Sequence, residues 1–497
     1  MTRPDYIVVG GGSAGCVAAA RLSELEAGSV LLLEAGPSHR HPLVSMPMGL
    51  VWLMGSGRDW RFRTTPQAGL GGRTIAVPRG RMLGGSGSIN SMVWFRGRAA
   101  DFDGWQIPGW SFADVEPHFE AVEARLTPAE LAHPHPLTAA LGPMLPANAP
   151  NPTPDLESAG VFRFNLVAGR RNSAADAFLQ GAPVTARTGA SVARLIFSGG
   201  RATGVTLTDG SEIPATKGVI LSAGSIASPA ILLRSGFGPR GDLAALGIDA
   251  RADLPAIGAN LHDHPAVGIH FEGPRSGYGL EPGQLPQWAL APFRYVLSRQ
   301  GPFASPTVEG GAFFNARGDD TEPDIQTHFI PFKLDTKGRR ISLGAGYFAD
   351  VCLCRPRSRG RLTLASKDPE APPAIDLGLF SEDSDLDTLA HGLARMRVLL
   401  DRADFGPRRA PEIRPGTGVR THAEIRDHIR AHAGTAYHPV GTLALGGPVT
   451  PDLRLAHTDN LWIADASIIP AIPSANTNAP SMMIGHRAAS LIAGEHP

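Results

Sequence analysis

The sequence is poor in cysteine and lysine, and both shortages limit what the protein can be. Its 497 residues include three cysteines, Cys16, Cys352 and Cys354. They are too few for a disulfide framework and are not spaced for a zinc site, so we expect buried free thiols in a reducing compartment and no metal site. Only four of the 46 basic residues are lysines, which we attribute to genomic bias and not to function.

Net charge and long apolar runs are also missing. The 46 basic residues balance 46 acidic ones, and no run of five or more like charges occurs, which argues against nucleic acid or an anionic membrane surface as a partner. No apolar run reaches the roughly 18 residues that span a bilayer, and no secretory signal precedes the first expected strand. We expect a cytoplasmic protein without a membrane span; the sequence leaves its oligomeric state open.

The composition that remains is that of a large globular protein. Hydrophobic residues make up 42% of the chain, and 497 residues exceed a single ordinary core, which favours two closely joined domains. The 59 glycines and 44 prolines are spread along the chain, which indicates many turns and close backbone approaches.

The most informative stretch opens the chain. Residues 6–9, Tyr-Ile-Val-Val, have the composition of a buried parallel strand. Gly10, Gly12 and Gly15 follow as G-x-G-x-x-G, where the strand should turn into a helix. The first glycine permits the turn, the second lets the backbone approach a pyrophosphate, and the third lets helix and strand pack closely.

The residues after the glycines complete a dinucleotide-binding pattern. A helix over about residues 14–26 offers its N-terminal N–H groups to phosphates. A second strand over residues 30–33 ends at Glu34, which is placed to hydrogen-bond ribose hydroxyls. We predict a dinucleotide site; this element alone leaves NAD and FAD both open.

A second informative stretch spans residues 78–97, PRGRMLGGSGSINSMVWFRG. Its small-residue loop can lie flat against a large planar ligand because few side chains obstruct it. Apolar residues flank the loop, which argues against a solvated surface position.

Later segments carry both strand and helix patterns. Residues 190–207 indicate two strands around a turn, and residues 219–233 a strand, a turn and a helix with Pro229 in its first turn. Apolar runs at 308–314, 325–331 and 346–353 indicate strands, and 385–400 an amphipathic helix with Val398 on its apolar side. Aromatic candidates for a pocket lining, each equally consistent with core packing, are Phe314, Phe332, Tyr347 and Phe348.

The chain resembles the glucose–methanol–choline (GMC) oxidoreductases, a family of FAD enzymes. Residues 78–97 resemble the first family signature and residues 219–233 the second. The resemblance continues through GTAYHPVGTLALGG at 434–447 and PSANTNAPSMMIGHRAASLI at 473–492, so it covers nearly the whole chain. It favours FAD over NAD.

The resemblance implies an α/β fold in two discontinuous domains. A Rossmann-like FAD-binding domain with a parallel sheet would comprise residues 1–115, 166–265 and 431–497. An α+β substrate-binding domain, with an antiparallel sheet backed by helices, would comprise residues 116–165 and 266–430.

The resemblance also implies the site residues. His438 matches the catalytic histidine of the family, and Asn476 matches a second position that is His or Asn in different members. The implied FAD-binding residues are Gly10, Gly12, Ser13, Ala14, Gly15, Glu34, Ala35, Trp60, Arg79, Leu83, Gly84, Gly85, Ser86, Asn90, Met92, Val93, Val192, Ala223, Gly224, Ser228, Asp465, Ala466, Thr477, Asn478 and Ala479.

The reaction explains these residue types. Oxidising an alcohol removes a proton from oxygen and a hydride from carbon, and the flavin accepts the hydride. Histidine, with an ordinary pKa of about 6.5, suits the base that takes the proton. Asn476 can fix the substrate oxygen without titrating. Some members tether FAD through a histidine where this chain has Ile89, so we predict non-covalent FAD.

His262 and His264 flank Asp263 in a loop at 254–265. This pattern can suggest a metal site, but we expect the three residues to form hydrogen bonds instead.

We predict oxidation of a small to medium primary alcohol to the aldehyde, with O₂ or a quinone-type acceptor reoxidising the flavin. Aromatic or heteroaromatic methanols are favoured over choline, because nothing in the sequence marks an acidic site for a quaternary ammonium. A flavin-dependent lyase or decarboxylase on the same fold is the alternative, with Cys352 and Cys354 as the only plausible stand-ins for the cysteine such enzymes use. A non-enzymatic flavin-binding protein would need His438 and Asn476 to be merely structural.

Overall fold

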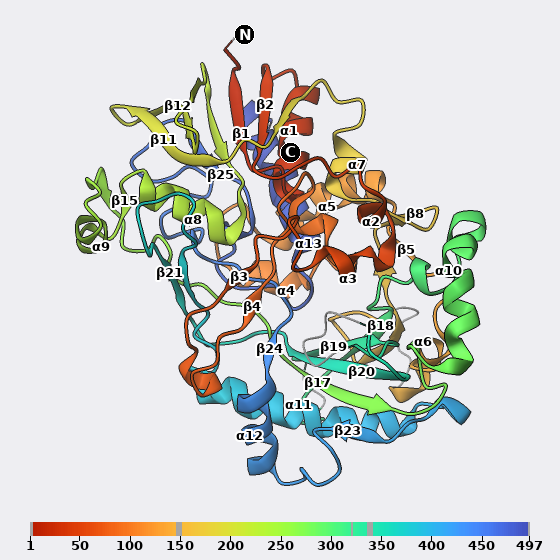
Figure 1. The fold of residues 1–497 in the computed structure, drawn as a ribbon. Coiled ribbons are helices and arrows are strands. Elements are labelled where there is room, and N and C mark those ends of the chain that lie inside the picture. Colours follow the sequence, from red (N-terminus) through yellow and green to blue (C-terminus); the bar gives the residue numbers. More distant parts are fainter. Residues whose placement is uncertain (1–2, 146–151, 320–321, 335–340, 496–497) are drawn as a thin grey trace.

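Two sheets, one parallel and one antiparallel, organise the chain (Figure 1). The computed structural model describes residues 3–145, 152–319, 322–334 and 341–495. Parts of the predicted ranges 1–115, 116–165, 266–430 and 431–497 therefore lie outside the described residues. The expected α/β class, with a Rossmann-like sheet and a second antiparallel sheet, is confirmed.

The parallel sheet has five strands from three distant parts of the chain. Its β1 strand is fully buried and pairs with β2 on one side and β14 on the other. Burial on both faces is what the continuous apolar run of β1 indicates. The strands in spatial order are β10 (Thr185–Thr188), β2 (Val30–Glu34), β1 (Tyr6–Val9), β14 (Gly218–Leu221) and β25 (Leu461–Ile463).

Helices from both ends of the chain cover this sheet. Helix α1 (Ser13–Glu24) packs along α13 (Asn478–Ala493), and α5 (Phe112–Leu126) packs on α13 in turn. Gly485 allows the first contact, because a Cβ there would meet the backbone of Ala14. The N- and C-terminal segments thus form one packed layer (Figure 1).

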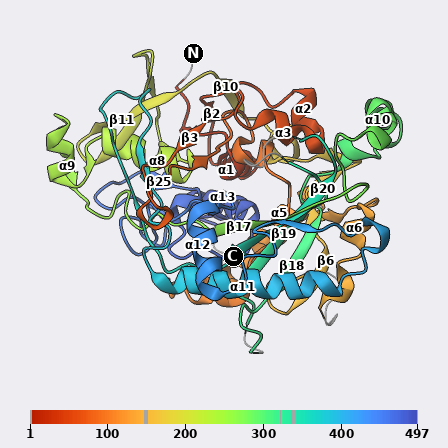
Figure 2. The ribbon, with the colours of Figure 1, turned by 60° about the horizontal axis from the view of Figure 1, so that its bottom comes forward.

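The antiparallel sheet has seven strands, and β17, β20, β19 and β18 form its centre. Helix α11 (Asp383–Arg402) contacts β20 and β17, and α12 (His422–His432) packs on α11. Both helices lie below the sheet in Figure 1, and Figure 2 shows α11 along its lower edge. Val398 is 54% exposed, so its predicted place on the apolar side of the helix is wrong. The strands are β6 (Ser158–Val161), β17 (Pro265–Glu272), β18 (Gly310–Phe314), β19 (Ile325–Ile330), β20 (Gly346–Leu353), β23 (Glu412–Arg414) and β24 (Gly434–Thr435).

A smaller sheet and two longer helices complete the main elements. The expected strand pair at 190–207 forms β11 (Val192–Ser198) and β12 (Arg201–Leu207), joined by β13 (Glu212–Pro214). Helix α8 (Gly224–Arg234) begins directly after the Ala-Gly turn, so Pro229 lies inside it and not in its first turn as predicted. Helix α10 (Leu285–Ser298) lies at the edge of the molecule in both ribbon views.

The remaining elements are short. The helices are α2 (Pro42–Ser45), α3 (Leu50–Leu53), α4 (Ala99–Asp103), α6 (Pro136–Ala139), α7 (Ala174–Phe178) and α9 (Arg240–Ala245). The strand pairs are β3 (Phe62–Arg63) with β4 (Ala76–Val77), β5 (Ala129–Glu130) with β7 (Arg163–Phe164), β8 (Leu166–Val167) with β9 (Arg170–Arg171), β15 (Phe237–Gly238) with β16 (Ala252–Asp253), and β21 (Arg361–Thr363) with β22 (Ala374–Asp376). No helix among the described residues is long and apolar enough to cross a membrane.

Candidate active site

A single large cavity joins the two sheets. Its volume is about 840 Å³, and its wall runs from Val9 and Glu34, at the carboxyl ends of β1 and β2, to His328 and Asp350 on the antiparallel sheet. Ligands of open parallel sheets bind at this edge. Both sequence motifs and both predicted catalytic residues contribute to the wall.

The glycine turn at the start of α1 forms one end of the cavity. Gly10 has φ +99°, and a Cβ there would meet the backbone of Ser222 and Ala223. A Cβ at Gly15 would collide with the carbonyl oxygen of Gly10, whereas one at Gly12 would meet no protein atom within 4 Å. Gly12 is also the N-cap of α1, and no side chain caps this helix. Its N-terminal N–H groups are therefore available to an anion in the cavity.

Polar groups around this turn also fit a dinucleotide. Ser13 Oγ donates to Asn478 Oδ1 at 2.7 Å, while the buried Asn478 Nδ2 has no hydrogen-bond partner among the described residues. The Glu34 carboxylate accepts hydrogen bonds from the backbone N–H of Gly11 (3.0 Å) and Gly36 (2.7 Å), and burial raises its pKa. A pyrophosphate and a ribose need hydrogen-bond donors and a backbone that is not covered by side chains. The unpaired buried donor and the glycine turn supply these two features.

Most of the predicted cofactor residues line the cavity. They are Gly10, Gly12, Ser13, Ala14, Glu34, Ala35, Trp60, Arg79, Gly85, Ser86, Asn90, Met92, Val93, Val192, Ala223, Gly224, Asp465, Ala466, Thr477 and Asn478.

Five predicted cofactor residues do not line it: Gly15, Leu83, Gly84, Ser228 and Ala479. Their observed contacts are structural. Gly84 N–H donates to the Gly11 carbonyl at 2.7 Å, and Ser228 Oγ donates to Asp465 at 2.6 Å. These residues support the wall from the side away from the cavity, and their contact with the cofactor stays a prediction.

His438 and Asn476 meet at the opposite end of the cavity. Asn476 Nδ2 lies 3.1 Å from His438 Nε2. Gln326 on β19 donates from Nε2 to Asn476 Oδ1 at 3.0 Å, which directs the Asn476 amide nitrogen toward His438. The final loop and a strand of the antiparallel sheet together set this geometry.

His264 fixes the tautomer of His438. His264 Nε2 lies 3.1 Å from the Pro473 carbonyl oxygen, so it carries the proton, and Nδ1 of neutral His264 is an acceptor. His438 Nδ1 lies 3.1 Å from that acceptor and must donate to it. His438 Nε2 consequently presents a lone pair to the cavity. Burial, followed by the neighbouring His264 and His328, holds the pKa of His438 well below its ordinary value, so the ring is neutral at pH 7.

Asp263 positions the loop that carries His438. Its Oδ1 accepts the backbone N–H of His438 at 2.8 Å, and burial raises its pKa to about 7. The expectation that His262, Asp263 and His264 form hydrogen bonds is confirmed; His262 Nε2, for example, accepts the N–H of Ile472 at 3.1 Å. Sequence reasoning missed that two of the three support His438.

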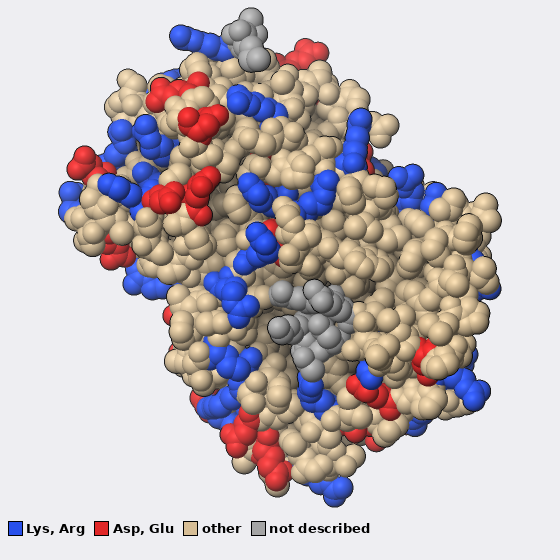
Figure 3. Space-filling model, viewed as in Figure 1, with Lys and Arg blue, Asp and Glu red and all other residues tan. Residues whose placement is uncertain are grey.

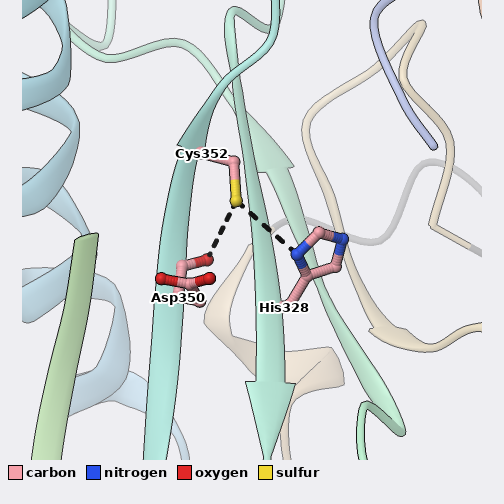
Figure 4. Close-up of side chains that lie close together, drawn as sticks. All are labelled: His328, Asp350 and Cys352. Carbon is pink, nitrogen blue, oxygen red and sulfur yellow. Dashed lines mark hydrogen bonds between the residues drawn. The ribbon is translucent and has the colours of Figure 1, made fainter. Parts of the chain in front are cut away.

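A second polar cluster lies on the antiparallel sheet beneath Asn476. His328 on β19 and Asp350 on β20 are direct cross-strand neighbours, and both line the cavity. Cys352 Sγ lies 3.5 Å from His328 Nδ1 and contacts the backbone carbonyl of Asp350 (Figure 4). Among the described residues, none donates a hydrogen bond to the Asp350 carboxylate, and burial raises its pKa to about 7.

The sequence held one signal for this cluster. Gln326, His328 and Asp350 are polar residues inside strands that are otherwise apolar and buried, and such residues mark a site or a network. Of the four aromatic candidates, Phe348 lines the cavity. Phe314, Phe332 and Tyr347 belong to packed cores, which is the alternative that the sequence left open for them.

A dinucleotide turn and a neutral histidine base in one cavity define an oxidoreductase that uses a nucleotide cofactor. Comparison with known proteins agrees with this class. Models of the GMC oxidoreductase family match residues 4–266 and 356–485. The chain is 35% identical to an oxygen-dependent choline dehydrogenase from Rhizobium etli, over 99% of this chain and 96% of the relative.

Two further relatives show the same likeness. An alcohol dehydrogenase [acceptor] from Pseudomonas putida is 34% identical, over 98% of this chain and 95% of the relative. The crystal structure of pyridoxine 4-oxidase from Mesorbium loti superimposes with a TM-score of 0.85 at 27% identity, covering 99% of this chain and 100% of that one. The chain therefore belongs to the GMC oxidoreductase family and is an FAD-dependent oxidoreductase that acts on alcohols.

Proposed function

We propose that the protein oxidises small to medium primary alcohols to aldehydes, with His438 as the base. The observation that carries this proposal is the lone pair on His438 Nε2, which lies beside the Asn476 amide in the wall of the cavity. A neutral imidazole in this position can take the hydroxyl proton. FAD, when bound, supplies the acceptor for the hydride.

Asn476 has the role of fixing the substrate oxygen. Its amide is held by Gln326 on one side and faces two ring nitrogens, His438 Nε2 at 3.1 Å and His328 Nε2 at 3.4 Å. A hydroxyl that enters between these groups can donate to His438 and accept from Asn476. This arrangement places the departing proton next to the base and leaves the adjacent carbon directed into the cavity.

FAD is proposed to be held without a covalent bond. The position that carries a tethering histidine in some relatives is Ile89, a buried residue in the cavity wall with no nucleophilic atom. Acid precipitation should release the yellow colour into the supernatant; a yellow pellet would contradict this part of the proposal.

An aromatic or heteroaromatic methanol suits the apolar part of the wall. Leu50 of α3 and Met54, which follows that helix, face this space with Ile330 and Phe348 of the antiparallel sheet. Apolar and aromatic walls with few polar groups favour a flat, weakly polar substrate. The relation to pyridoxine 4-oxidase is consistent with such a substrate.

A cationic amino alcohol is a second candidate, because Asp350 supplies the acid that the sequence did not reveal. Its carboxylate faces the cavity, cross-strand from His328, with no donor among the described residues. An ammonium group there would stabilise the ionised carboxylate. The choline dehydrogenase relatives support this substrate.

The electron acceptor is proposed to be O₂ or a quinone. The names of two relatives, an oxygen-dependent dehydrogenase and an acceptor-dependent one, support both. Comparing the reoxidation rates of reduced holoprotein with O₂ and with a soluble quinone would separate them.

An anaerobic alcohol panel tests the function itself. Benzylic, furan and pyridine methanols, choline and simple aliphatic alcohols should be added to holoprotein while flavin absorbance is followed. At least one should bleach the flavin, and His438→Ala should lower the rate about 10²–10⁴-fold while retaining bound flavin. If no alcohol bleaches the holoprotein, the proposal fails. If product forms from a substrate without any acceptor, a lyase or decarboxylase is indicated instead.

A further inference from the structure

Helix α10 exposes its apolar side to solvent. Five large apolar side chains in this helix are exposed: Leu285 (54%), Leu290 (49%), Phe293 (67%), Val296 (65%) and Leu297 (84%). Single exposed hydrophobic residues are common, but a contiguous row on one helix marks an interaction site.

The inner side of α10 holds the helix in this orientation. Trp288 Nε1 donates to the Gly279 carbonyl at 2.8 Å, and the Tyr295 hydroxyl donates to the Gly169 carbonyl at 3.3 Å. Ala291, which lies between them on the same side, is fully buried. Because these contacts fix the rotation of the helix, the apolar row is directed outward by the structure.

The charges within the segment that carries the row have one sign, and the acid Glu281 lies directly before it. No Asp or Glu occurs from residue 282 to residue 308, whereas Arg294 is exposed and Arg299 ends the helix over the Tyr295 ring. Burial raises the pKa of Tyr295, and Arg170, also exposed, is close enough to oppose part of that rise. Figure 3 shows an almost uncharged surface over α10, at the right edge of that view.

We propose that α10 docks on the surface of a bilayer containing anionic phospholipid. The row of Leu, Phe and Val side chains would enter the headgroup region, and Arg294, Arg299 and Arg170 would face lipid phosphates. A helix with an apolar side, no acidic residues and flanking arginines has the composition of interfacial anchors. Lying on the surface does not require a membrane-spanning helix.

Charge decides between a bilayer and a second copy of the chain. A two-fold contact through α10 would bring Arg294 against the same segment of its partner, in which residues 282–308 supply no carboxylate to pair with it. Anionic headgroups neutralise this surface, because arginines near the membrane are attracted to anionic lipid. The balanced charge of the whole chain does not oppose this docking. The docking surface is mainly apolar, and the arginines that would contact lipid lie close to α10.

The docking surface continues to the cavity wall. The Trp288 ring packs on Phe303 (6.3 Å between ring centroids), and Phe303 packs on Trp52 (6.1 Å). Trp52 is 44% exposed and belongs to α3, whose Leu50 lines the cavity together with the following Met54. Tryptophan at the edge of an apolar surface suits the interface between headgroups and acyl chains. Docking through α10 would therefore bring this wall close to the bilayer.

Vesicle co-sedimentation of the holoprotein tests the proposal. Vesicles of phosphatidylcholine alone are compared with vesicles that also contain phosphatidylglycerol, at low and high salt. The wild type should sediment with the anionic vesicles, and Phe293→Ser/Leu297→Ser should lower its partition coefficient at least tenfold. Arg294→Glu should remove the preference for phosphatidylglycerol and its salt dependence.

The matched control is Val398→Ser/Ile413→Ser. These apolar side chains are also exposed, to 54% and 46%, but lie away from α10 on α11 and β23. The control should sediment like the wild type, and all variants should oxidise alcohol with a soluble acceptor at the wild-type rate. Equal sedimentation of wild type and Phe293→Ser/Leu297→Ser, or none by either, overturns the proposal. A concentration-dependent dimer that this double variant abolishes, without vesicle binding, would assign the surface to a second copy.

Discussion

His264 Nδ1 and His438 Nδ1 face each other at 3.1 Å, and this contact sets which nitrogen of His438 carries the lone pair. The other ring nitrogen of His438, Nε2, then carries no hydrogen and faces the cavity, next to Asn476. A buried histidine thus orients another, in a position that a carboxylate occupies in many hydrolases. Because both rings are neutral, the base is ready without first losing a proton.

His264→Phe should lower kcat by about ten- to a hundredfold, part of the 10²–10⁴-fold that a positioned base contributes. The variant leaves the His438 Nδ1–H without its acceptor, so the productive tautomer is less populated. His264→Gln, which restores an acceptor, should recover part of the rate. In the wild type the acid limb of kcat/KM should lie below pH 6.5, because the pKa of His438 is lowered. Equal rates and pH profiles for the wild type and His264→Phe would show that His264 only fills space.

Gly12→Ala and Gly15→Ala should separate cofactor binding from folding. The Gly15 methyl would collide with the Gly10 carbonyl, so this variant should lose about 1–3 kcal/mol of unfolding free energy. The Gly12 methyl would meet no protein atom within 4 Å and would point into the cavity. Its apoprotein should unfold at the wild-type urea concentration but bind FAD at least tenfold more weakly. Gly57→Ala, also without neighbours within 4 Å, is the control for both.

Asp350 makes substrate choice dependent on pH. Burial raises its pKa to about 7, so its ionised fraction increases as the pH rises from 6 to 8. If amino alcohols are substrates, their KM should fall over this interval, and Asp350→Asn should abolish that fall. The KM of a neutral aryl methanol should change little in either protein. An unchanged KM for choline in Asp350→Asn would exclude a direct contact with the cation.

A histidine pair should make the fold sensitive to acid. His118 Nδ1 lies 2.9 Å from His486 Nδ1, between α5 and α13, and burial lowers their pKa values to about 3 and about 4. Both values lie below the unfolded value of about 6.5, so the unfolded state binds more protons below that pH. The free energy of unfolding should therefore fall as the pH drops from 6.5 toward 4, by at most about 1.4 kcal/mol per pH unit for each histidine.

Urea unfolding at pH 7 and pH 5 measures this effect. His486→Gln keeps a polar group opposite His118 but cannot be protonated, so its loss of stability between the two pH values should be smaller than that of the wild type. His457→Gln, at an exposed loop position away from the pair, is the control and should behave like the wild type. A pH dependence that His486→Gln leaves unchanged would place the acid sensitivity at other buried histidines.

How far the sequence predicts this molecule depends on the range of the interaction. The glycine turn at Gly10–Gly15 is local, and its strand, turn and helix form as the spacing predicts. His438 and Asn476 come together as their resemblance to the family implies. Gln326, His328 and Asp350 were missed because only the pairing of β19 with β20 places them under Asn476. The local sequence does not show whether a polar residue in such a strand belongs to a functional site or is only tolerated in the core.

The same limit explains the error at Val398 and the alternatives left open for the aromatic residues. Val398 follows the helical period but falls where α11 has no neighbour, and Phe314 and Tyr347 are core residues because α11 and the antiparallel sheet enclose them. From its sequence, α10 resembles an ordinary amphipathic helix. Only its contacts in the structure show that its apolar side faces solvent.

The position of β25 bears on synthesis of the protein. This strand closes one edge of the sheet that begins with β1, and α13, which follows it, covers α1. About 450 residues must leave the ribosome between the two strands, which at 5–20 residues per second takes roughly 20–90 s. Throughout that interval the nascent Rossmann unit has an open edge and an uncovered helix. Premature termination before residue 461 would therefore remove Asn476 and also the strand and helix that complete the first part of the fold to be synthesised. Truncated chains should therefore be substrates for chaperones and proteases.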